Sequence, residues 1–426
     1  MSDTKNDSAW GQLFEKHKVL TAVQKNGSFE ITSAEINQVR EARLMTKFDH
    51  RTNLPKIFAD NNLSILPITR GSYVISQFDA YKDFEKINTE IIRVSFPQYI
   101  SSIDYENISS EATAINCAYV SGIIADFVGD EHLMPTVSGR MSSSSFDFNI
   151  RNVNLEKDMP IKVINSQMEI DGGYEGLKYL TLIEAKNSIS KDFLVRQLYY
   201  PYRLWCENII KKIKTVFMVY SNGIYNLYEY LFEQKNRYNS LVLVNQKNYS
   251  IEDLDIGLDD IISVLNRTII VAEPQISFPQ ANSLKRVINL CELLCQNDMT
   301  RDDITTNYDF DPRQTNYYTD AARYLGLVDK RRENGSVVFF LTSEGEKLFK
   351  LKYKARQLKF VELILKHKPF NETLGKCLKS GDIPLRDEIV TIMENTGVYR
   401  VESQNTYERR ASTISGWINW ILDLQR

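Results

Sequence analysis

Two short apolar runs joined by a glycine-rich segment constrain the fold of this chain most. The first run, 167–171, reads Gln-Met-Glu-Ile-Asp, and the second, 180–186, reads Leu-Thr-Leu-Ile-Glu-Ala-Lys. Each has the length and apolar content of a buried β-strand. The intervening Gly172, Gly173 and Gly176 predict a turn that folds one run back toward the other.

Charged residues stand at the ends of both runs and are spaced to meet. Strand side chains alternate between two faces, so Glu184 and Lys186 project to one side and their apolar neighbours to the other. Glu169 and Asp171 share a face of the first strand for the same reason. We expect two or three carboxylates and one ammonium group to converge, which is the minimum needed for a divalent metal and an attacking water.

Length and composition exclude several classes of protein. A chain of 426 residues exceeds what a single core usually supports, so we expect two to four domains. A hydrophobic content of 43% and a charged content of 25% are typical of a globular protein. No apolar run reaches membrane-spanning length and the polar N-terminus lacks a signal peptide, which predicts a cytoplasmic protein without membrane association.

The cysteine and histidine residues are not spaced to form a metal site. The five cysteines form no CxxC pair, and the four histidines are scattered, so a zinc site is not expected. Cys291 and Cys295 lie one helical turn apart in an apolar run, where buried thiols are the favoured interpretation.

Breaks in the pattern divide the chain into four expected domains, 1–80, 81–275, 282–350 and 351–426. In the first, helices at 33–40, with a serine N-cap, and at 53–60 precede extended pieces at 63–68 and 71–75. Helix, helix and wing is a DNA-binding arrangement, and an interdomain packing module is the equal alternative. The basic residues available for DNA contacts here include Arg40, Arg43 and Arg70.

The second expected domain has the pattern of a mixed α/β core with helices on both sides. A helix at 110–128 is followed by a polar loop at 135–145, which is either a flexible connection or a phosphate-contacting loop with Arg140 and Ser142. A further helix begins near Phe193 and kinks or restarts at Pro201.

Further strands complete this core. They are expected at 146–150, 216–220, 224–232 and 240–244, with Asn222-Gly223 as a hairpin turn.

The third expected domain has the order of a winged helix-turn-helix, with helices at 284–294, from Asp302, and at 312–326, and then a basic turn at 330–336. Residues at the start of the last helix would reach base edges, and those of the turn would hold phosphates. The base-reading candidates are Arg313, Gln314, Asn316 and Tyr317, and the phosphate-holding candidates are Lys330, Arg331 and Arg332. Winged helices also serve as protein-interaction modules. The last domain is expected to be helical, possibly a second winged helix.

The pattern Asp171…Glu184-x-Lys186 resembles the signature of the PD-(D/E)XK nuclease superfamily, with Ile170 where a proline often stands. A following helix that contains Gln197 is also similar. The resemblance extends over residues 111–204, and with winged-helix modules the chain resembles a type II restriction endonuclease. The fold implied is a mixed β-sheet flanked by helices.

The resemblance implies roles for particular residues. Asp171 and Glu184 would bind Mg²⁺ with the carbonyl of Ala185, because magnesium prefers hard oxygen ligands. Lys186 would orient or help deprotonate the attacking water and stabilise the phosphorus.

Each of three further residues can be interpreted in two ways. Glu169 is a second metal ligand or a solvated partner of Lys162. Glu111 points into the site, or, as the favoured reading, only complements the helix dipole. Gln197 orients a water or a phosphate, or is a helix-surface amide.

The function that these features predict is Mg²⁺-dependent, site-specific cleavage of double-stranded DNA in restriction–modification defence. A homodimer on DNA and a cognate DNA methyltransferase are the expected physical and functional partners. Two alternatives remain open. One is a resolvase-like or repair nuclease on the same core, and the other is a DNA-binding regulator with an inactive core.

Overall fold

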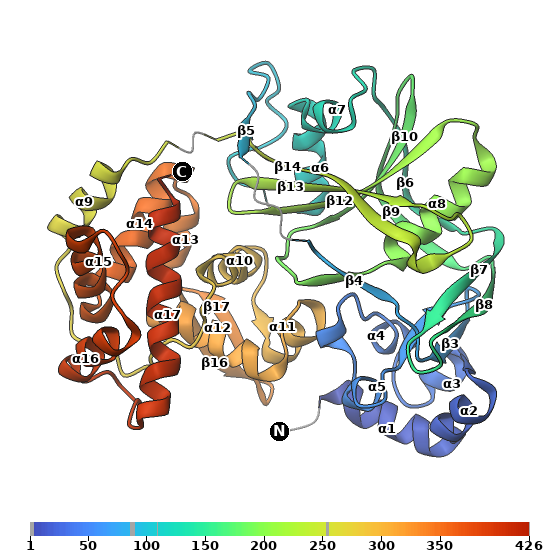
Figure 1. Ribbon diagram of the computed structural model, residues 1–426, viewed down its shortest axis with the longest axis horizontal. Helices are drawn as coiled ribbons and strands as arrows, with labels where there is room; N and C mark the ends of the chain where they lie inside the picture. Colours follow the sequence, from blue (N-terminus) through green and yellow to red (C-terminus); the bar gives the residue numbers. More distant parts are fainter. Residues whose placement is uncertain (1–3, 86–89, 109, 253–254, 426) are drawn as a thin grey trace.

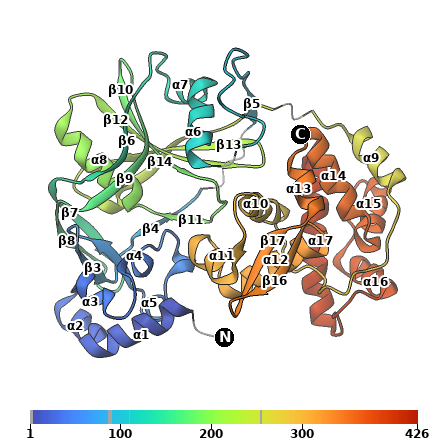
Figure 2. The ribbon, with the colours of Figure 1, turned by 180° about the vertical axis from the view of Figure 1, so that it is seen from behind.

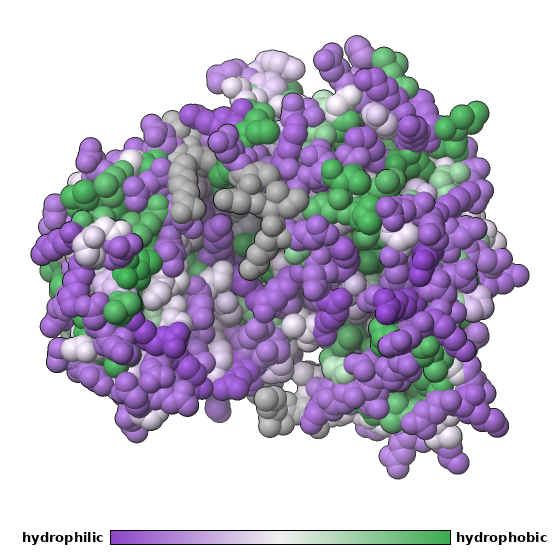
Figure 3. Space-filling view, viewed as in Figure 1, coloured by the Kyte–Doolittle hydropathy of each residue, from purple (hydrophilic) through white to green (hydrophobic). Residues whose placement is uncertain are grey.

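The chain folds into a mixed α/β protein, seen here in a computed structural model that describes residues 4–85, 90–108, 110–252 and 255–425. One seven-stranded sheet lies at one end of the molecule and a group of helices at the other, with smaller sheets between and beside them (Figures 1 and 2). Hydrophilic residues cover most of the face in Figure 3. None of the described helices is both long and apolar enough to cross a bilayer.

The N-terminal unit packs short helices around a three-stranded antiparallel sheet of order β1-β3-β2. Its elements are α1 (Lys5–His17), α2 (Val19–Asn26), β1 (Phe29–Thr32), α3 (Ser33–Asn37), α4 (Ala42–Met45), η1 (Arg51–Asn53), α5 (Lys56–Ala59), β2 (Ser64–Pro67) and β3 (Ser72–Ser76). The helix expected at 33–40 is shorter, and its N-cap is Thr32 rather than a serine, because Thr32 and Glu35 form a reciprocal capping box.

The central sheet has the order β5-β14-β13-β12-β10-β9-β6. Its strands are β5 (Ile91–Arg93), β6 (Met134–Ser142), β9 (Gln167–Glu175), β10 (Tyr179–Lys186), β12 (Lys212–Ser221), β13 (Ile224–Phe232) and β14 (Leu241–Ser250). β10 and β12 are parallel, whereas β9 and β10 are antiparallel.

Helices cover the two faces of this sheet. Ile183 and Ala185 pack with α6 (Glu111–Val120) and α7 (Ile123–Val128), and Leu180 and Leu182 pack with α8 (Arg196–Asn208). The alternation predicted for this strand is therefore confirmed.

Two expectations for the acidic strand pair are wrong. The segment 135–145 is mostly the edge strand β6 rather than a loop, and it pairs with β9. Gly172 and Gly173 lie within β9, and the turn follows at Gly176. A Cβ on Gly173 would approach the Val137 Cβ to 2.7 Å, so this glycine allows two strands to approach closely instead of forming a turn.

Other boundaries also differ. Residues 192–194 form a short strand, β11 (Asp192–Leu194), paired with β4 (Tyr81–Asp83), so the helix expected from Phe193 begins only at Arg196. Pro201 lies inside α8. The helix expected at 110–128 is broken at Gly122, whose φ is +79°. The strands β7 (Ser145–Asn152) and β8 (Lys157–Ile164) form a separate hairpin, and the second of them was not expected.

The Asn222-Gly223 hairpin is confirmed. Both residues have positive φ, 50° and 78°, as a two-residue turn between β12 and β13 requires.

The C-terminal region contains a three-stranded sheet of order β15-β17-β16 and otherwise helices. Its elements are α9 (Leu258–Arg267), α10 (Leu284–Leu294), β15 (Met299–Thr300), α11 (Arg301–Asn307), α12 (Pro312–Tyr324), β16 (Val328–Glu333), β17 (Ser336–Leu341), α13 (Ser343–Phe349), α14 (Tyr353–Leu365), α15 (Lys368–Ser380), α16 (Arg386–Thr396) and α17 (Gln404–Asp423). From α10 to β17 this is the order of a winged helix.

Two expectations for this region need correction. Lys330, Arg331 and Arg332 lie on β16 rather than in a turn, because the tight turn is formed by Asn334 and Gly335. The described residues beyond 351 are helical and contain no strand, so no second wing is present there.

Candidate active site

The predicted acidic residues meet where β9 and β10 separate. Paired positions end at Ile183 opposite Gly172, and beyond this point β10 continues beside β12 alone. Asp171 turns into the opening, and its Oδ2 accepts a hydrogen bond of 2.8 Å from the Ala185 amide. The carbonyl of Ala185 lies on this same side, because the amide and carbonyl of one strand residue point the same way.

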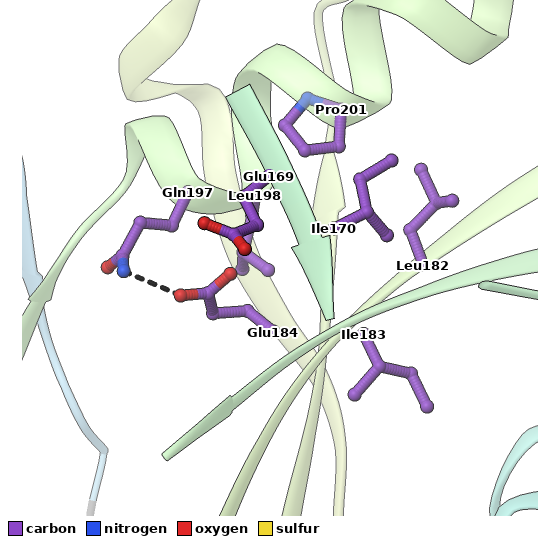
Figure 4. Close-up of a pocket in the computed structure, with 8 residues that line it drawn as sticks. All are labelled: Glu169, Ile170, Leu182, Ile183, Glu184, Gln197, Leu198 and Pro201. Atoms are coloured by element: carbon purple, nitrogen blue, oxygen red, sulfur yellow. Dashed lines mark hydrogen bonds between the residues drawn. The ribbon is translucent and has the colours of Figure 1, made fainter. Parts of the chain in front are cut away.

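Glu184 is the centre of the cluster. It is only 7% exposed, and its Oε1 accepts hydrogen bonds of 2.6 Å from both Lys186 Nζ and Gln197 Nε2. Figure 4 shows Gln197 reaching Glu184 from α8. Gln197 therefore faces the site, and its interpretation as a helix-surface amide is wrong. Its Oε1 is buried and has no hydrogen-bond partner in the described part of the chain.

The pKa values in the cluster are shifted mainly because its carboxylates are buried away from water. Burial raises the pKa of Glu184 to about 8, and the nearby Asp171 adds to this rise while Lys186 opposes it. Burial alone would lower the pKa of Lys186, but the carboxylates of Glu184 and Glu111 raise it overall. The ammonium group of Lys186 is thus held in its charged form.

Glu111 contributes to the same cluster. Burial raises the pKa of this first residue of α6, Lys186 opposes the rise, and Asp171 adds to it, so all three groups lie within electrostatic reach of one another. Glu111 also stands in the first turn of α6, where it complements the helix dipole, so both interpretations of this residue stay open.

Glu169 lies at the outer side of the cluster. Its carboxylate faces Glu184 in Figure 4, and both residues line one small pocket. It is exposed and forms an ion pair of 3.4 Å with Arg140, its register partner on β6. Lys162 lies opposite Asp147 on another hairpin, so its expected pairing with Glu169 is not observed.

The donor set fits magnesium rather than zinc. Asp171, Glu184 and the Ala185 carbonyl offer hard oxygens, and Mg²⁺ in proteins takes one or two carboxylates and fills its other positions with waters and phosphate oxygens. Among the described residues, no three His, Cys, Asp or Glu side chains gather into an all-protein cage. These residues can therefore form a magnesium site in which water and the substrate supply the remaining ligands.

The N-terminal candidates for DNA binding are scattered over the surface of their unit. Arg43 and Arg70 are exposed, whereas Arg40 donates a hydrogen bond of 2.8 Å to Asn6 Oδ1. Near the acidic cluster, Ser142 is exposed on β6 beyond Arg140 and lies 3.4 Å from Asn165 Oδ1.

The C-terminal candidates occupy the start of α12 and the strand β16. Arg313 donates to the Tyr317 hydroxyl, Gln314 completes a capping box with Asp311, and Asn316 is exposed. Lys330 and Arg332 are exposed, whereas Arg331 forms ion pairs with Asp298 and Glu333.

One residue near the cluster was not expected. Asp49, from the N-terminal unit, raises the pKa of both Glu184 and Lys186. The two residues that follow it, His50 and Arg51, form hydrogen bonds with Asp192 on β11, the strand that follows β10 in the chain. No motif could have shown this, since the contact depends on how two distant segments pack.

Three protein families match parts of the chain, and each is described only as a domain of unknown function. Residues 7–75 match one (DUF6996), residues 76–250 match the second (DUF6997) and residues 286–426 match the third (DUF7226). Each match spans less than half of the chain. No curated protein and no solved structure matches it.

Proposed function

We propose that this protein is a Mg²⁺-dependent endodeoxyribonuclease that cleaves duplex DNA at a specific sequence, on a core of the PD-(D/E)XK type. The observation that carries the proposal is the buried Glu184 carboxylate, held between Lys186 and Gln197 and close to Asp171. An acidic group with a pKa near 8 beside a second carboxylate is stabilised by a cation, so the cluster is suited to bind one.

The chemistry follows from the charges of the substrate. Hydroxide is repelled by an anionic phosphodiester until positive charge neutralises the phosphate, and a bound Mg²⁺ supplies that charge and lowers the pKa of water. Asp171, Glu184 and the Ala185 carbonyl would hold the ion against the scissile phosphate.

Lys186 acts as a fixed positive charge in this proposal. Its raised pKa keeps it protonated near neutral pH, so it orients the water and stabilises charge on the phosphorus rather than removing a proton. Gln197 is placed to orient a water, since its buried Oε1 accepts no hydrogen bond from the described residues and can accept one from that water.

The flanking units would supply the DNA contacts. The winged-helix order between α10 and β17 and the exposed basic residues on β16 favour a duplex partner. Cleavage of both strands needs two active sites or two visits, which favours a dimer on DNA. A restriction role would place the protein in the cytoplasm beside a methyltransferase that protects host DNA.

Cleavage of plasmid DNA by the purified full-length protein tests this function. We expect discrete linear fragments with Mg²⁺ and none with EDTA. Asp171→Asn and Lys186→Ala should each lower the rate by at least about 100-fold, because each removes charge stabilisation in the transition state, while duplex binding in EDTA persists. Lys214→Ala is the matched control, since Lys214 is also half-buried on the sheet and lies 3.0 Å from a carboxylate, that of Glu229.

Other outcomes separate the alternatives. A smear of products would indicate a nonspecific or repair-type nuclease on this core. Duplex binding without any cleavage would indicate a regulator with an inactive core. Undiminished cleavage by both site variants would contradict the site assignment.

A further inference from the structure

A groove of about 330 Å³ lies between the start of α12 and the first half of α17, because residues of both helices line it. Figures 1 and 2 show these two helices in the C-terminal region. Its volume is within the range of small-molecule sites. Side chains from three segments line it: Gln280 and Asn282 before α10, Gln314 and Tyr317 on α12, and Arg409 and Ser412 on α17.

The wall formed by residues 280–282 is fixed in place. Trp417 Nε1 donates a hydrogen bond of 2.7 Å to the Ala281 carbonyl, and Thr413 donates one of 2.9 Å to Asn282 Oδ1. A Cβ on Gly416 would lie 2.3 Å from the Asn282 carbonyl oxygen, so only glycine allows this approach. The groove is therefore a built feature of the fold.

One arginine, Arg409, lines the groove, and two others, Arg313 and Arg410, are chain neighbours of the lining residues Gln314 and Arg409. Arg313, Arg409 and Arg410 form no ion pair with any carboxylate in the described part of the chain. Arg410 lies within electrostatic reach of Tyr317, Arg409 and the Asp320 carboxylate, and its Nε is buried without a hydrogen-bond partner among the described residues. A lining guanidinium group that forms no ion pair favours an anionic ligand such as a phosphate.

The remaining lining groups suit a planar, hydrogen-bonding ring. The Tyr317 ring supplies a flat face, and the Arg313 guanidinium lies 5.5 Å from its centroid. Gln280 makes no hydrogen bond within the described residues, and the Asn282 amide nitrogen remains available, because its oxygen is the atom used by Thr413. Aromatic stacking with amide groups at the edge is how proteins bind a nucleobase outside the helix.

We propose that this groove binds a nucleobase turned out of a DNA duplex, with its phosphate near Arg409 and its ring on Tyr317. This inference rests on the proposed function only in requiring that the chain binds duplex DNA. It also revises how α12 would act. Because α17 forms the opposite wall, Gln314 and Tyr317 face a groove in the protein and would read a base that enters it, rather than base edges within the major groove.

Binding of matched duplexes to the full-length protein tests the proposal. Two labelled DNAs, identical except that one carries a single unpaired nucleotide, are titrated in EDTA so that no cleavage occurs. We expect the unpaired-base duplex to bind on the order of tenfold more tightly, since its base is already free to enter and stacking contributes at this scale. Tyr317→Ala should remove the preference, and Tyr317→Phe should keep it.

Tyr399→Ala is the matched control, because the Tyr399 ring also lies beside an arginine, Arg400 at 5.2 Å, but outside the groove. Equal affinity for both duplexes, or an unchanged preference in Tyr317→Ala, would overturn the proposal. Free deoxynucleoside monophosphates added as competitors separate the two sources of a base. Competition at concentrations similar to those of the unpaired duplex would assign the groove to a free nucleotide and reject the DNA base. None of these results depends on cleavage, so they remain distinct from the test of nuclease activity.

Discussion

At the scale of single residues, Glu184 stands in surroundings that disfavour its charged form. Its carboxylate is buried beside Asp171, and its neutral form is favoured by the surroundings up to a pH of about 8. A pKa shifted this far by the surroundings of a side chain is typical of functional sites. The neighbouring Lys186 offsets only part of this shift, although the two groups are 2.6 Å apart.

The raised pKa of Glu184 predicts that the stability of the metal-free protein depends on pH. The pKa of Glu184 is raised from 4.5 to about 8 on folding, so the folded chain binds more protons than the unfolded chain between these values. The free energy of unfolding should therefore fall as pH rises through this window. Lys186 does not offset the fall, because its pKa lies above 10.5 and the residue stays protonated, folded or unfolded, across this window.

Glu184→Gln should flatten this dependence. Since one unit of pKa shift corresponds to about 1.4 kcal/mol, the fall in unfolding free energy between pH 5 and pH 8 should be smaller in the variant than in the wild type by at least about 1 kcal/mol. Urea denaturation in EDTA at pH 5 and at pH 8 measures it. Identical pH profiles for the two proteins would contradict the environment described for Glu184.

At the scale of elements, close approach of β6 and β9 sets the edge of the sheet beside the site. Gly173→Ala would place a methyl group 2.7 Å from the Val137 Cβ, so we expect a loss of about 1–3 kcal/mol in unfolding free energy, as for other overpacked positions. Gly375→Ala is the control, because Gly375 lies in α15 with no atom within 4 Å of an added Cβ. That change should raise the thermal midpoint. Equal midpoints for the two variants would refute the account.

Sequence patterns predicted elements well where periodicity or a specific turn was present, and poorly where packing decides. The Asn222-Gly223 hairpin and the face alternation of β10 depend on local rules, and both are confirmed. The strand β6 was missed because it is a mostly exposed edge strand whose polar sequence resembles a loop. Gly173 was assigned to a turn because nothing in the sequence reports how closely Val137 approaches.

The active-site residues show the same division. Asp171, Glu184 and Lys186 could be chosen from a local motif. The parts played by Glu111, Gln197 and Asp49 depend on how helices and a distant unit pack against the sheet, so for these the sequence left alternatives or no indication.

At the scale of the whole molecule, three segments meet just after β10. Asp309, which is 2% exposed, accepts hydrogen bonds from Thr52 at 2.6 Å and from the Lys191 amide at 2.9 Å. Asn289 of α10 contacts the same loop through the Asn187 carbonyl and the Ile189 amide. The C-terminal region and the N-terminal unit therefore both hold the loop that follows Lys186.

Removing Asp309 should loosen this junction. Asp309→Ala leaves the buried Arg286 without its carboxylate partner and frees two donors, so we expect a loss of about 3–5 kcal/mol in unfolding free energy. Asp329→Ala removes an exposed carboxylate 3.7 Å from Arg323 and should change stability by less than about 0.5 kcal/mol. Chemical denaturation compares them, and equal effects would show that the junction is not a buried anchor.

Titration of Mn²⁺, a close substitute for Mg²⁺, into the full-length protein by calorimetry tests the central claim most directly, since that claim is that Asp171 and Glu184 together hold one hard cation. We predict one site that weakens strongly in Asp171→Asn and in Glu184→Gln and persists in Glu229→Gln, which alters a carboxylate paired with a lysine elsewhere on the same sheet. Binding that survives unchanged in both site variants, or no binding to the wild-type protein, would contradict the account.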